Sequence, residues 1–543
     1  MPRLARHLVA GVAAATAAAL LLAGCASDPG SDDSTLTFAV DGANLASHMD
    51  PHATQLDIGA LVQRATFDSL VFQGADGTLS PWLAESWEVS DDELTYTFQL
   101  RDDVTFHDGT AFDADAVVAN IEHVIAPETA SAQAASSIGF DSEDPEAGAF
   151  ESVEATGEYE VVFTFRRPFV TFLSALATTN LGIYSPTALA EHADDLRTGG
   201  PGISVGSGPY VLSELVADQE IVYTANPDYA WGPDGGGVPA IDRLVVRIVP
   251  EESVRIGAFN SGDVTAVGRV NASVLGDVTR EADVSNVSLP GVPYSMYINT
   301  KHGVFTDPLV RQAFRIGFDV DGPVESIFDG EVQRAWSILA PTTPNSYDAS
   351  LEGSWPYDAA AAEDLLDQAG WTERDSDGYR TKDGQRLSAV WAAYTPVSDS
   401  NAALADSIQS DLKDIGFELV REQLEPAQYN ERYATLDFDL TDWGFGGTDA
   451  DVLRNHLHSA GFQNAANVSD PALDAILEEA VATSDPAVRE RLYTQVQEWN
   501  QENVAIVPLY LPAVITVVST DVTGLTYDIE GRPLFATAAL AAR

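Results

Sequence analysis

Residues 81–123 constrain the fold of this chain most, because their hydrophobic pattern changes period within one short segment. At positions 94–100 apolar residues alternate with polar ones, which is the pattern of a half-buried strand. Asp108-Gly109 marks a turn, and after Asp113 the apolar residues follow helical spacing until Pro127 prevents the helix from continuing. The segment therefore predicts a strand, a turn, a short strand and a helix, without a pattern typical of catalysis.

The composition limits both the class of protein and its partners. A chain of 543 residues with 45% hydrophobic residues is long enough to bury the cores of several lobes. Its 83 acidic and 28 basic residues give a net charge of −55. Such a surface repels phosphate backbones, so the charge disfavours a nucleic-acid partner. We interpret the excess of carboxylates as a solvated surface rather than as an acidic binding site.

The N-terminus has the features of an export signal. Two arginines precede an apolar run at 8–22, which is too short for a comfortable membrane span, so residues 1–24 are predicted to be a signal peptide. Leu22-Ala23-Gly24-Cys25 resembles the bacterial lipobox, which implies cleavage before Cys25 and lipidation of its sulfur. Cys25 is also the one cysteine of the chain, so no intramolecular disulfide can form. Residues 25–34 are then predicted to be a flexible tether; the alternative is an ordinary signal peptide.

Strand and helix patterns are mixed along the rest of the chain without a repeat. Asp-Pro begins three predicted helices, at positions 307, 470 and 485, because aspartate can cap free amides and proline suits the first helical position. The mixture is typical of an α/β or α+β protein with several lobes. We predict strands at 36–40, 159–165, 210–212, 221–227 and 244–249, and further helices at 60–72 and 358–369.

One motif suggests a hydrolase and is disfavoured by its surroundings. Ser204 lies in a Gly-x-Ser-x-Gly sequence, which in a secreted serine hydrolase requires a strand before the serine and a helix after it. Here glycines and a proline precede the motif, and Gly208-Pro209 and a predicted strand follow it. We therefore expect no catalytic residue, and the hydrolase remains a remote alternative.

Two histidine pairs and one aspartate-rich loop contain residues of the types that bind metals. Pro51 separates His48 from His52, and the pair His456 and His458, expected on one face of a strand, has no third ligand. Asp375-Ser376-Asp377-Gly378 lacks the further ligands of a calcium loop and, with Asp383-Gly384, is interpreted as two turns of a small hairpin. We expect neither a bound metal nor a cofactor.

The amino-acid sequences of several segments resemble those of one known family. LAESWEVSDDELTYTFQLRDDVTFHDGTAFDADAVV closely resembles the signature of the family 5 extracytoplasmic solute-binding proteins, the oligopeptide, dipeptide and nickel receptors of ABC importers. The resemblance implies an α/β, periplasmic-binding-protein-like fold with two lobes around a ligand cleft, joined by a hinge, and an additional inserted domain. Further segments fit the family: VGSGPYVL, TANPDYAWG, SMYINTKHGVFTDPLVRQAFRIGFDVDGPVESIFDG, YDAAAAEDLLDQAGW and WNQENVAIVPLY.

The resemblance also implies how the chain is divided. Lobe I would be assembled from residues 35–80, 181–290 and 506–543, the inserted domain would span 81–180, and lobe III would span 291–505. The protein would be a monomer that closes over a small solute by hinge motion and presents it to the ABC permease subunits. The hinge strands are expected near 294–299 and 504–508.

Aromatic side chains at the ends of two strands are the predicted solute contacts. Solute sites are mostly aromatic and apolar, and the family's ligand contacts fall where these strands run into loops. In the family's peptide receptors, an aspartate three residues after the matching tryptophan holds the amino terminus of the peptide. Counting from Trp443 that position is Gly446, so Asp442 and Asp449 are the candidates to replace it. The predicted contacts are Thr54, Gln55, Trp391, Tyr394, Trp443, Phe445 and Asp449. A peptide or peptide-like solute is expected, with a sugar or a nickel or metal chelate as alternatives.

Overall fold

The computed structural model describes residues 34–541, apart from 43, 44, 46, 47, 55, 56, 130 and 345. The predicted signal peptide, the lipidation site Cys25, almost the whole tether and the predicted contact Gln55 lie outside the described residues. Residues Thr35–Arg543 form one compact unit. Among its described residues, no helix is long and apolar enough to cross a membrane.

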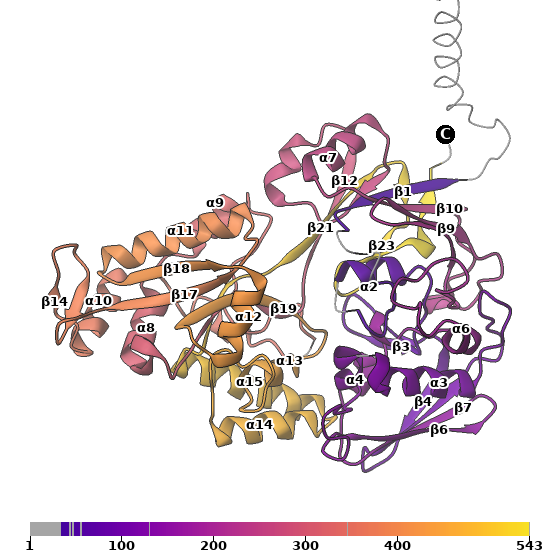
Figure 1. The fold of residues 1–543 in the computed structure, drawn as a ribbon, viewed down its shortest axis with the longest axis horizontal. Coiled ribbons are helices and arrows are strands. Elements are labelled where there is room, and N and C mark those ends of the chain that lie inside the picture. The colour runs from indigo at the N-terminus through magenta and orange to yellow at the C-terminus, as the bar shows by residue number, and fades with distance from the viewer. Residues whose placement is uncertain are drawn as a thin grey trace, which may run out of the picture. The chain divides into compact units, whose positions relative to one another are not determined.

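A seven-stranded mixed sheet forms lobe I, in the order β12-β21-β11-β1-β10-β9-β8 (Figure 1). The central strand β1 runs parallel to β10 and β11, and the outer pairs are antiparallel. Segments far apart in the sequence therefore meet in one sheet, as the family resemblance implies. The strands are β1 (Thr35–Val40), β8 (Tyr210–Val216), β9 (Glu220–Ala225), β10 (Arg243–Ile248), β11 (Ala266–Val267), β12 (Ala282–Ser288) and β21 (Ala513–Ser519), with helices α2 (Asp57–Gln63) and α7 (Glu252–Ser261). Helix α6 (Pro186–Glu191) instead buries Ala188 and Leu189 in the core of the inserted domain.

The inserted domain is built on a four-stranded antiparallel sheet, β4-β5-β7-β6. Tyr96, Phe98 and Leu100 of β5 are buried and the residues between them are not, so the alternation predicted from the sequence is confirmed. Helix α3 begins after Asp113, whose carboxylate accepts a hydrogen bond from the amide of Ala116. The bounds are β4 (Ala84–Val89), β5 (Thr95–Leu100), β6 (Phe150–Gly157), β7 (Glu160–Phe165), α3 (Ala114–Ile125), α4 (Ala132–Ser137) and α5 (Phe172–Ala175), beside the hairpin β2 (Val71–Gln73) and β3 (Leu79–Pro81).

A five-stranded sheet, β18-β17-β19-β13-β20, forms lobe III. Strands β17, β18 and β19 are parallel, whereas β13 and β20 are antiparallel to their neighbours. The three predicted Asp-Pro helices are confirmed, because each aspartate accepts a hydrogen bond from an amide of the first turn. The elements are β13 (Gly291–Ile298), β17 (Ser388–Tyr394), β18 (Glu418–Leu424), β19 (Leu440–Gly446), β20 (Ile506–Tyr510), α8 (Pro308–Ile316), α9 (Asp321–Ile327), α10 (Ala359–Gln368), α11 (Asp399–Asp414), α12 (Pro426–Thr435), α13 (Val452–Leu457), α14 (Pro471–Val481) and α15 (Pro486–Asn503).

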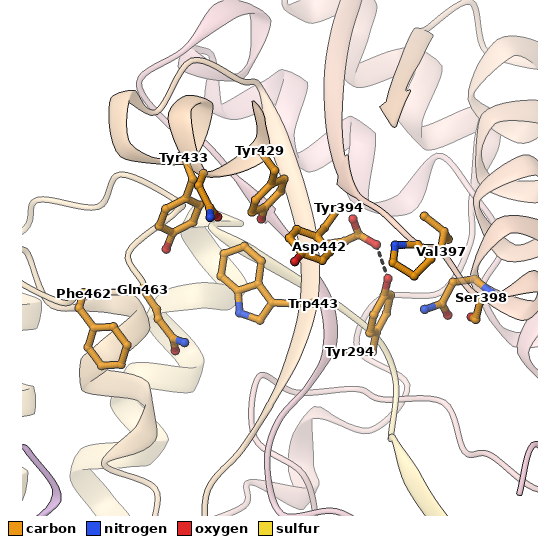
Figure 2. Close-up of a pocket in the computed structure, with 13 residues that line it drawn as sticks. Tyr294, Tyr394, Val397, Ser398, Tyr429, Tyr433, Asp442, Trp443, Phe462 and Gln463 are labelled. Carbon is orange, nitrogen blue, oxygen red and sulfur yellow. Dashed lines mark hydrogen bonds between the residues drawn. The ribbon is translucent and has the colours of Figure 1, made fainter. Parts of the chain in front are cut away.

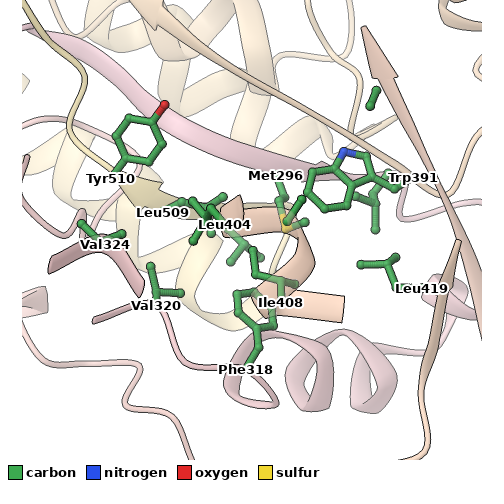
Figure 3. Close-up of a cluster of buried hydrophobic side chains, with 14 of the residues drawn as sticks. Met296, Phe318, Val320, Val324, Trp391, Leu404, Ile408, Leu419, Leu509 and Tyr510 are labelled. Atoms are coloured by element: carbon green, nitrogen blue, oxygen red, sulfur yellow. The ribbon is translucent and has the colours of Figure 1, made fainter. Parts of the chain in front are cut away.

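Alternate side chains of this sheet point into two buried clusters on its opposite faces. Met296, Trp391 and Leu440 belong to the cluster covered by α8, α10 and α11, part of which Figure 3 shows. Tyr297 and Ala392, their neighbours in sequence, belong to the cluster covered by α13, α14 and α15. Each face of the sheet therefore has its own packed layer of helices.

Two short segments connect the sheets of lobe I and lobe III. Residues 289–290 join β12 to β13, and residues 511–512 join β20 to β21; the amide of Leu289 donates to the carbonyl of Pro512 over 2.8 Å. The boundary expected at residues 505–506 is therefore wrong, because β20 pairs with β13 inside lobe III. The hinge strands expected near 294–299 and 504–508 lie in the pairing of β13 with β20 inside lobe III. The segments that cross between the lobes are instead 289–290, directly after β12, and 511–512, directly after β20.

Other local predictions have mixed outcomes. The helix expected at 60–72 ends at Gln63, and Val71–Gln73 is a strand. The two-turn hairpin at residues 373–386 is confirmed as β14 (Glu373–Arg374), β15 (Arg380–Lys382) and β16 (Gln385–Arg386). Near the C-terminus, two small ladders pair β22 (Val522–Thr523) with β25 (Ala539–Leu540) and β23 (Thr526–Tyr527) with β24 (Pro533–Leu534).

Candidate functional site

A cavity of about 740 Å³ opens in lobe III where two parallel strands separate. Strands β17 and β19 pair at Trp391–Leu440 and Ala392–Thr441, and no pairing continues toward their carboxyl ends. Carboxyl ends of parallel strands are a common place for a ligand crevice, and the volume lies in the range of small-molecule sites. Figure 2 shows the thirteen lining residues: Tyr294, Tyr394, Pro396, Val397, Ser398, Asn401, Tyr429, Asn430, Tyr433, Asp442, Trp443, Phe462 and Gln463.

Tyrosines from α12 and β17 form one wall of the cavity. Tyr429 and Tyr433 lie one turn apart on α12, so they share a face, and their rings are 6.0 Å apart and nearly parallel. Tyr394, at the end of β17, meets Tyr429 edge to face at 5.2 Å and is 46% exposed. The hydroxyl of Tyr429 shares a hydrogen bond with Thr441 Oγ1 at 2.8 Å, which fixes α12 against β19.

Trp443 of β19 forms the adjoining wall and has an unpaired donor. Its indole stacks on Tyr297 at 4.0 Å, and Tyr433 meets its edge at 5.8 Å. Trp443 Nε1 and Gln463 Oε1 are buried, and neither atom has a hydrogen-bond partner within the described part of the chain. A buried polar group without a partner costs about 1–3 kcal/mol. A solute that carries both an acceptor and a donor would recover this cost.

Asp442 is the one charged side chain among the lining residues. It accepts hydrogen bonds from Trp391 Nε1, at 2.7 Å, and from the hydroxyl of Tyr294, as Figure 2 shows for the latter. Burial raises the pKa of Asp442 above its usual range, against the opposing effects of these two hydrogen bonds and of the Arg421 charge. Arg421 lies over the ring of Trp391, 5.1 Å from its centre. Within the described residues no ion pair to Asp442 is formed.

Two of the predicted contacts lie in the cavity, and Trp391 does not. Tyr394 and Trp443 line it. Trp391 is 2% exposed and belongs to the core under α11, so its expected stacking on the solute is wrong (Figure 3). Its indole instead holds the carboxylate of Asp442 in place.

The remaining predicted contacts are engaged elsewhere in the structure. Phe445 is half-buried and its ring meets His456 edge to face at 5.4 Å. Asp449 forms an ion pair with Arg489, with 2.6 Å between Oδ1 and Nη2. Thr54 is buried in lobe I, where its carbonyl accepts a hydrogen bond from Asn180. Of the two candidates to replace a carboxylate at position 446, only Asp442 faces the cavity.

Position 446 itself has a carboxylate nearby. Gly446 ends β19 opposite Gly291 and is exposed. A Cβ added there would lie 3.5 Å from Glu530 Oε1, which reaches it from the turn between β23 and β24. Glu530 forms an ion pair with Arg532. A negative charge from lobe I therefore lies where the side chain of an aspartate at 446 would begin.

Several lining residues were missed by the sequence analysis. Tyr429 and Tyr433 stand four positions apart on a helix without any buried residue, and this spacing is the one signal that could have found them. Tyr294, Phe462 and Gln463 carry no such signal, because β13 and the segment after α13 reach the cavity only through the tertiary fold.

The other motifs do not form sites. Ser204 is buried in an irregular segment and its Oγ accepts from the amide of Gly200, so the strand and helix of a nucleophile elbow are missing around it. His52 is buried against His123, with 2.9 Å between their Nδ1 atoms. The sequence pattern predicted that His456 lies on a strand, but it is buried in helix α13. His458 contacts Glu478. No group of three or more metal-ligating side chains is assembled by the described residues.

Comparisons with known proteins agree in fold and family. The sequence model of the bacterial extracellular solute-binding proteins, family 5 middle region, matches residues 78–464. The probable di/tripeptide-binding protein 5 of Pseudomonas aeruginosa is 28% identical over 494 residues, covering 86% of this chain and 88% of its own. The nickel-binding periplasmic protein of Escherichia coli is 26% identical over 480 residues, covering 86% and 87%.

Solved structures give the same picture. NikA from Brucella suis in complex with Fe(III)-EDTA superposes with a TM-score of 0.79 at 25% identity, covering 94% of this chain and 100% of its own. The periplasmic binding protein DppA from Helicobacter pylori, in complex with the peptide STSA, superposes with a TM-score of 0.74 at 25% identity, covering 94% and 98%.

Proposed function

Because this chain belongs to the bacterial extracellular solute-binding proteins of family 5, we propose that it captures a peptide-like solute outside the cell and delivers it to an ABC permease. The observation that carries the choice of solute is the pair of unpaired polar atoms in the cavity wall, Trp443 Nε1 and Gln463 Oε1. A peptide bond has one acceptor and one donor, which are the two kinds of partner that these atoms lack.

The rest of the cavity suits the remaining parts of such a solute. An amino group would meet the carboxylate of Asp442, which has no ion-pair partner within the described residues. Apolar or aromatic parts would lie against Tyr394, Tyr429 and Tyr433. Side chains of varied shape are tolerated by such a wall, because stacking on an aromatic ring requires no fixed pattern of hydrogen bonds.

Capture would proceed by closure of lobe III against lobe I and the inserted domain. The crossing segments at 289–290 and 511–512 are short enough to act as hinges. A contact between the inserted domain and lobe III is formed by Glu93, whose carboxylate accepts hydrogen bonds from the amide of Ser484, at 3.2 Å, and from its hydroxyl. The amide of Val170 also donates to the carbonyl of Val481 over 3.2 Å. These contacts would favour the closed form that the permease recognises.

The receptor would be held at the membrane by a lipid on Cys25. This part of the proposal rests on the lipobox-like Leu22-Ala23-Gly24-Cys25. Replacing Cys25 with serine should move the protein from the membrane fraction to the soluble extracytoplasmic fraction. An unchanged distribution would contradict the lipid anchor and leave the solute site unaffected.

The solute proposal is tested by thermal shift and calorimetry on the purified protein. Peptides of two to five residues, sugars and a nickel–histidine chelate form the panel, and a ligand at one hundred times its Kd stabilises the folded state by about 2.7 kcal/mol. We expect peptides to raise the Tm of the wild type. Trp443→Phe should weaken peptide binding and so reduce this shift, whereas the remote control Trp87→Phe should leave it unchanged. A response to sugar or nickel chelate alone would overturn the peptide proposal, and no response from any class would overturn the receptor proposal.

A further inference from the structure

The charges of the lining residues indicate a narrower class of solute than peptides in general. Of the thirteen described side chains that line the cavity, Asp442 alone is charged, and none is a lysine, an arginine or a histidine. Both hydrogen bonds that Asp442 accepts come from neutral donors, Tyr294 and Trp391, which orient the carboxylate without neutralising it. Arg421 lies over the Trp391 ring and its charge acts on Asp442, but no ion pair joins the two side chains in the described structure. The lining therefore carries one carboxylate that forms no ion pair within the described residues.

The aromatic walls favour the same sign of ligand charge. The faces of Trp443, Tyr394, Tyr429 and Tyr433 are electron-rich, and a cation within about 6 Å of such a ring is attracted by it. The chain as a whole, with a net charge of −55, adds a long-range field that concentrates cations and repels anions near its surface.

A free carboxylate on the solute would find neutral donors, such as Trp443 Nε1, but no positively charged group among the described lining residues. Asn401, Asn430, Ser398 and Gln463 are also neutral, and none of them offers a full positive charge. A carboxylate placed here would lose its hydration beside the charge of Asp442, which is costly at this degree of burial. The lining thus discriminates between the two ends of a zwitterion.

We propose that the cavity selects organic cations, with an ammonium group held between Asp442 and the aromatic walls and with no free carboxylate inside the cavity. This inference rests on the proposed receptor function and names its substrate class. It applies to amines and to peptides whose carboxyl end is blocked or lies outside the cavity.

The test compares three forms of one dipeptide that differ in the groups, and therefore the charges, at their two ends. Ala-Phe amide is a cation, free Ala-Phe is a zwitterion and N-acetyl-Ala-Phe is an anion. Calorimetry on the purified protein should show that affinity decreases from the amide to the free dipeptide to the acetylated form. The amide should bind at least tenfold more tightly than the acetylated form. Acetylated peptide binding as tightly as the amide would overturn the inference while leaving the receptor function in place. If no form binds, a thermal-shift library of cationic, neutral and anionic solutes decides: a cation that binds supports the inference, a neutral or anionic solute that depends on Trp443 overturns it, and no binder at all overturns the receptor function.

Asp442→Asn separates recognition from a structural role. It preserves the shape and the acceptor for Trp391 and removes the charge, so cation affinity should fall tenfold or more while a neutral solute is unaffected. The Tm without ligand should stay equal or rise, because burial raises the pKa of Asp442 and its charge is costly in the empty protein. Asp437→Asn, an exposed change of the same charge on the same lobe, is the matched control. Equal cation affinity in Asp442→Asn and wild type would overturn the proposal.

Discussion

One substitution, tryptophan to phenylalanine, should have opposite effects at two positions on neighbouring strands. At Trp391 it removes the Nε1 hydrogen bond to Asp442 and leaves space in a core where the indole is 2% exposed. A hydrogen bond to a charged group contributes about 1.5–3 kcal/mol, and the lost packing adds to this, so Trp391→Phe should cost about 2–4 kcal/mol of the free energy of unfolding. At Trp443 the ring keeps its stack on Tyr297, and a buried donor without a partner is removed.

Trp443→Phe should therefore change the free energy of unfolding by less than about 1 kcal/mol, since removing an unpaired donor recovers about 1–3 kcal/mol and offsets the smaller ring. Its affinity for solute should fall up to tenfold, the value of one hydrogen bond. Urea denaturation with an unchanged m-value measures the first quantity and calorimetry the second. Trp87→Phe in the inserted domain controls for the loss of any indole. A large loss of stability in Trp443→Phe together with unchanged affinity would refute the assignment of Trp443 to the cavity.

Three further predictions concern charges around the site. Gly446→Asp should destabilise the protein, because its carboxylate would lie beside Glu530, and Glu530→Gln should restore the loss; a double-mutant cycle by urea denaturation should give a coupling of about 0.5–3 kcal/mol, and additive effects would contradict the contact. Glu93→Gln should weaken solute binding about twofold to fivefold, as expected for an exposed charged contact, and Ser484→Ala should not add to it in calorimetry. Because burial raises the pKa of Asp442, the folded state binds protons more tightly than the unfolded state. The wild type should therefore gain stability relative to Asp442→Asn as the pH falls toward that pKa, and its affinity for cations should fall over the same range. Parallel curves of Tm against pH for the two proteins would refute this.

Local chemistry explains which elements the sequence could predict. The helices after Asp113 and after the Asp-Pro pairs were found because the aspartate caps the helix within a few residues of its own position. The helix expected at 60–72 ends earlier, at Gln63, because the next residue, Arg64, is held by contacts outside the helix. Its guanidinium is buried and donates to Ser69 and to the carbonyl of Ala177, contacts that belong to the tertiary fold.

The position of the second crossing segment could not be predicted for a related reason. Strands β20 and β21 are both apolar, and two residues separate them. Nothing local indicates that Ile506–Tyr510 pairs with β13 while Ala513–Ser519 pairs with β12. Membership of a sheet depends on partners more than two hundred residues away, so the boundary of a lobe formed from several segments is a property of the whole chain.

The same limit separates the residues of the site. Trp391 and Trp443 both stand near the end of an apolar strand, and the sequence treats them alike. The packing of α11 over one face of the sheet buries the first, while the second lies beyond the last pairing of β17 with β19. Tyr394, also predicted as a solute contact, lines the cavity because it is the final residue of its strand, where the chain has to leave the sheet.

Asp442 and Asp449 show what decides between two equivalent candidates. Both are aspartates close to Trp443, and either could supply the carboxylate missing at Gly446. Asp449 is neutralised by Arg489, forty residues away in sequence but 2.6 Å away in the fold. Asp442 receives hydrogen bonds from neutral donors and forms no ion pair within the described residues, so its carboxylate remains available inside an aromatic cavity. The selectivity of the receptor would then depend less on which acid is present than on which acid is left without a basic partner.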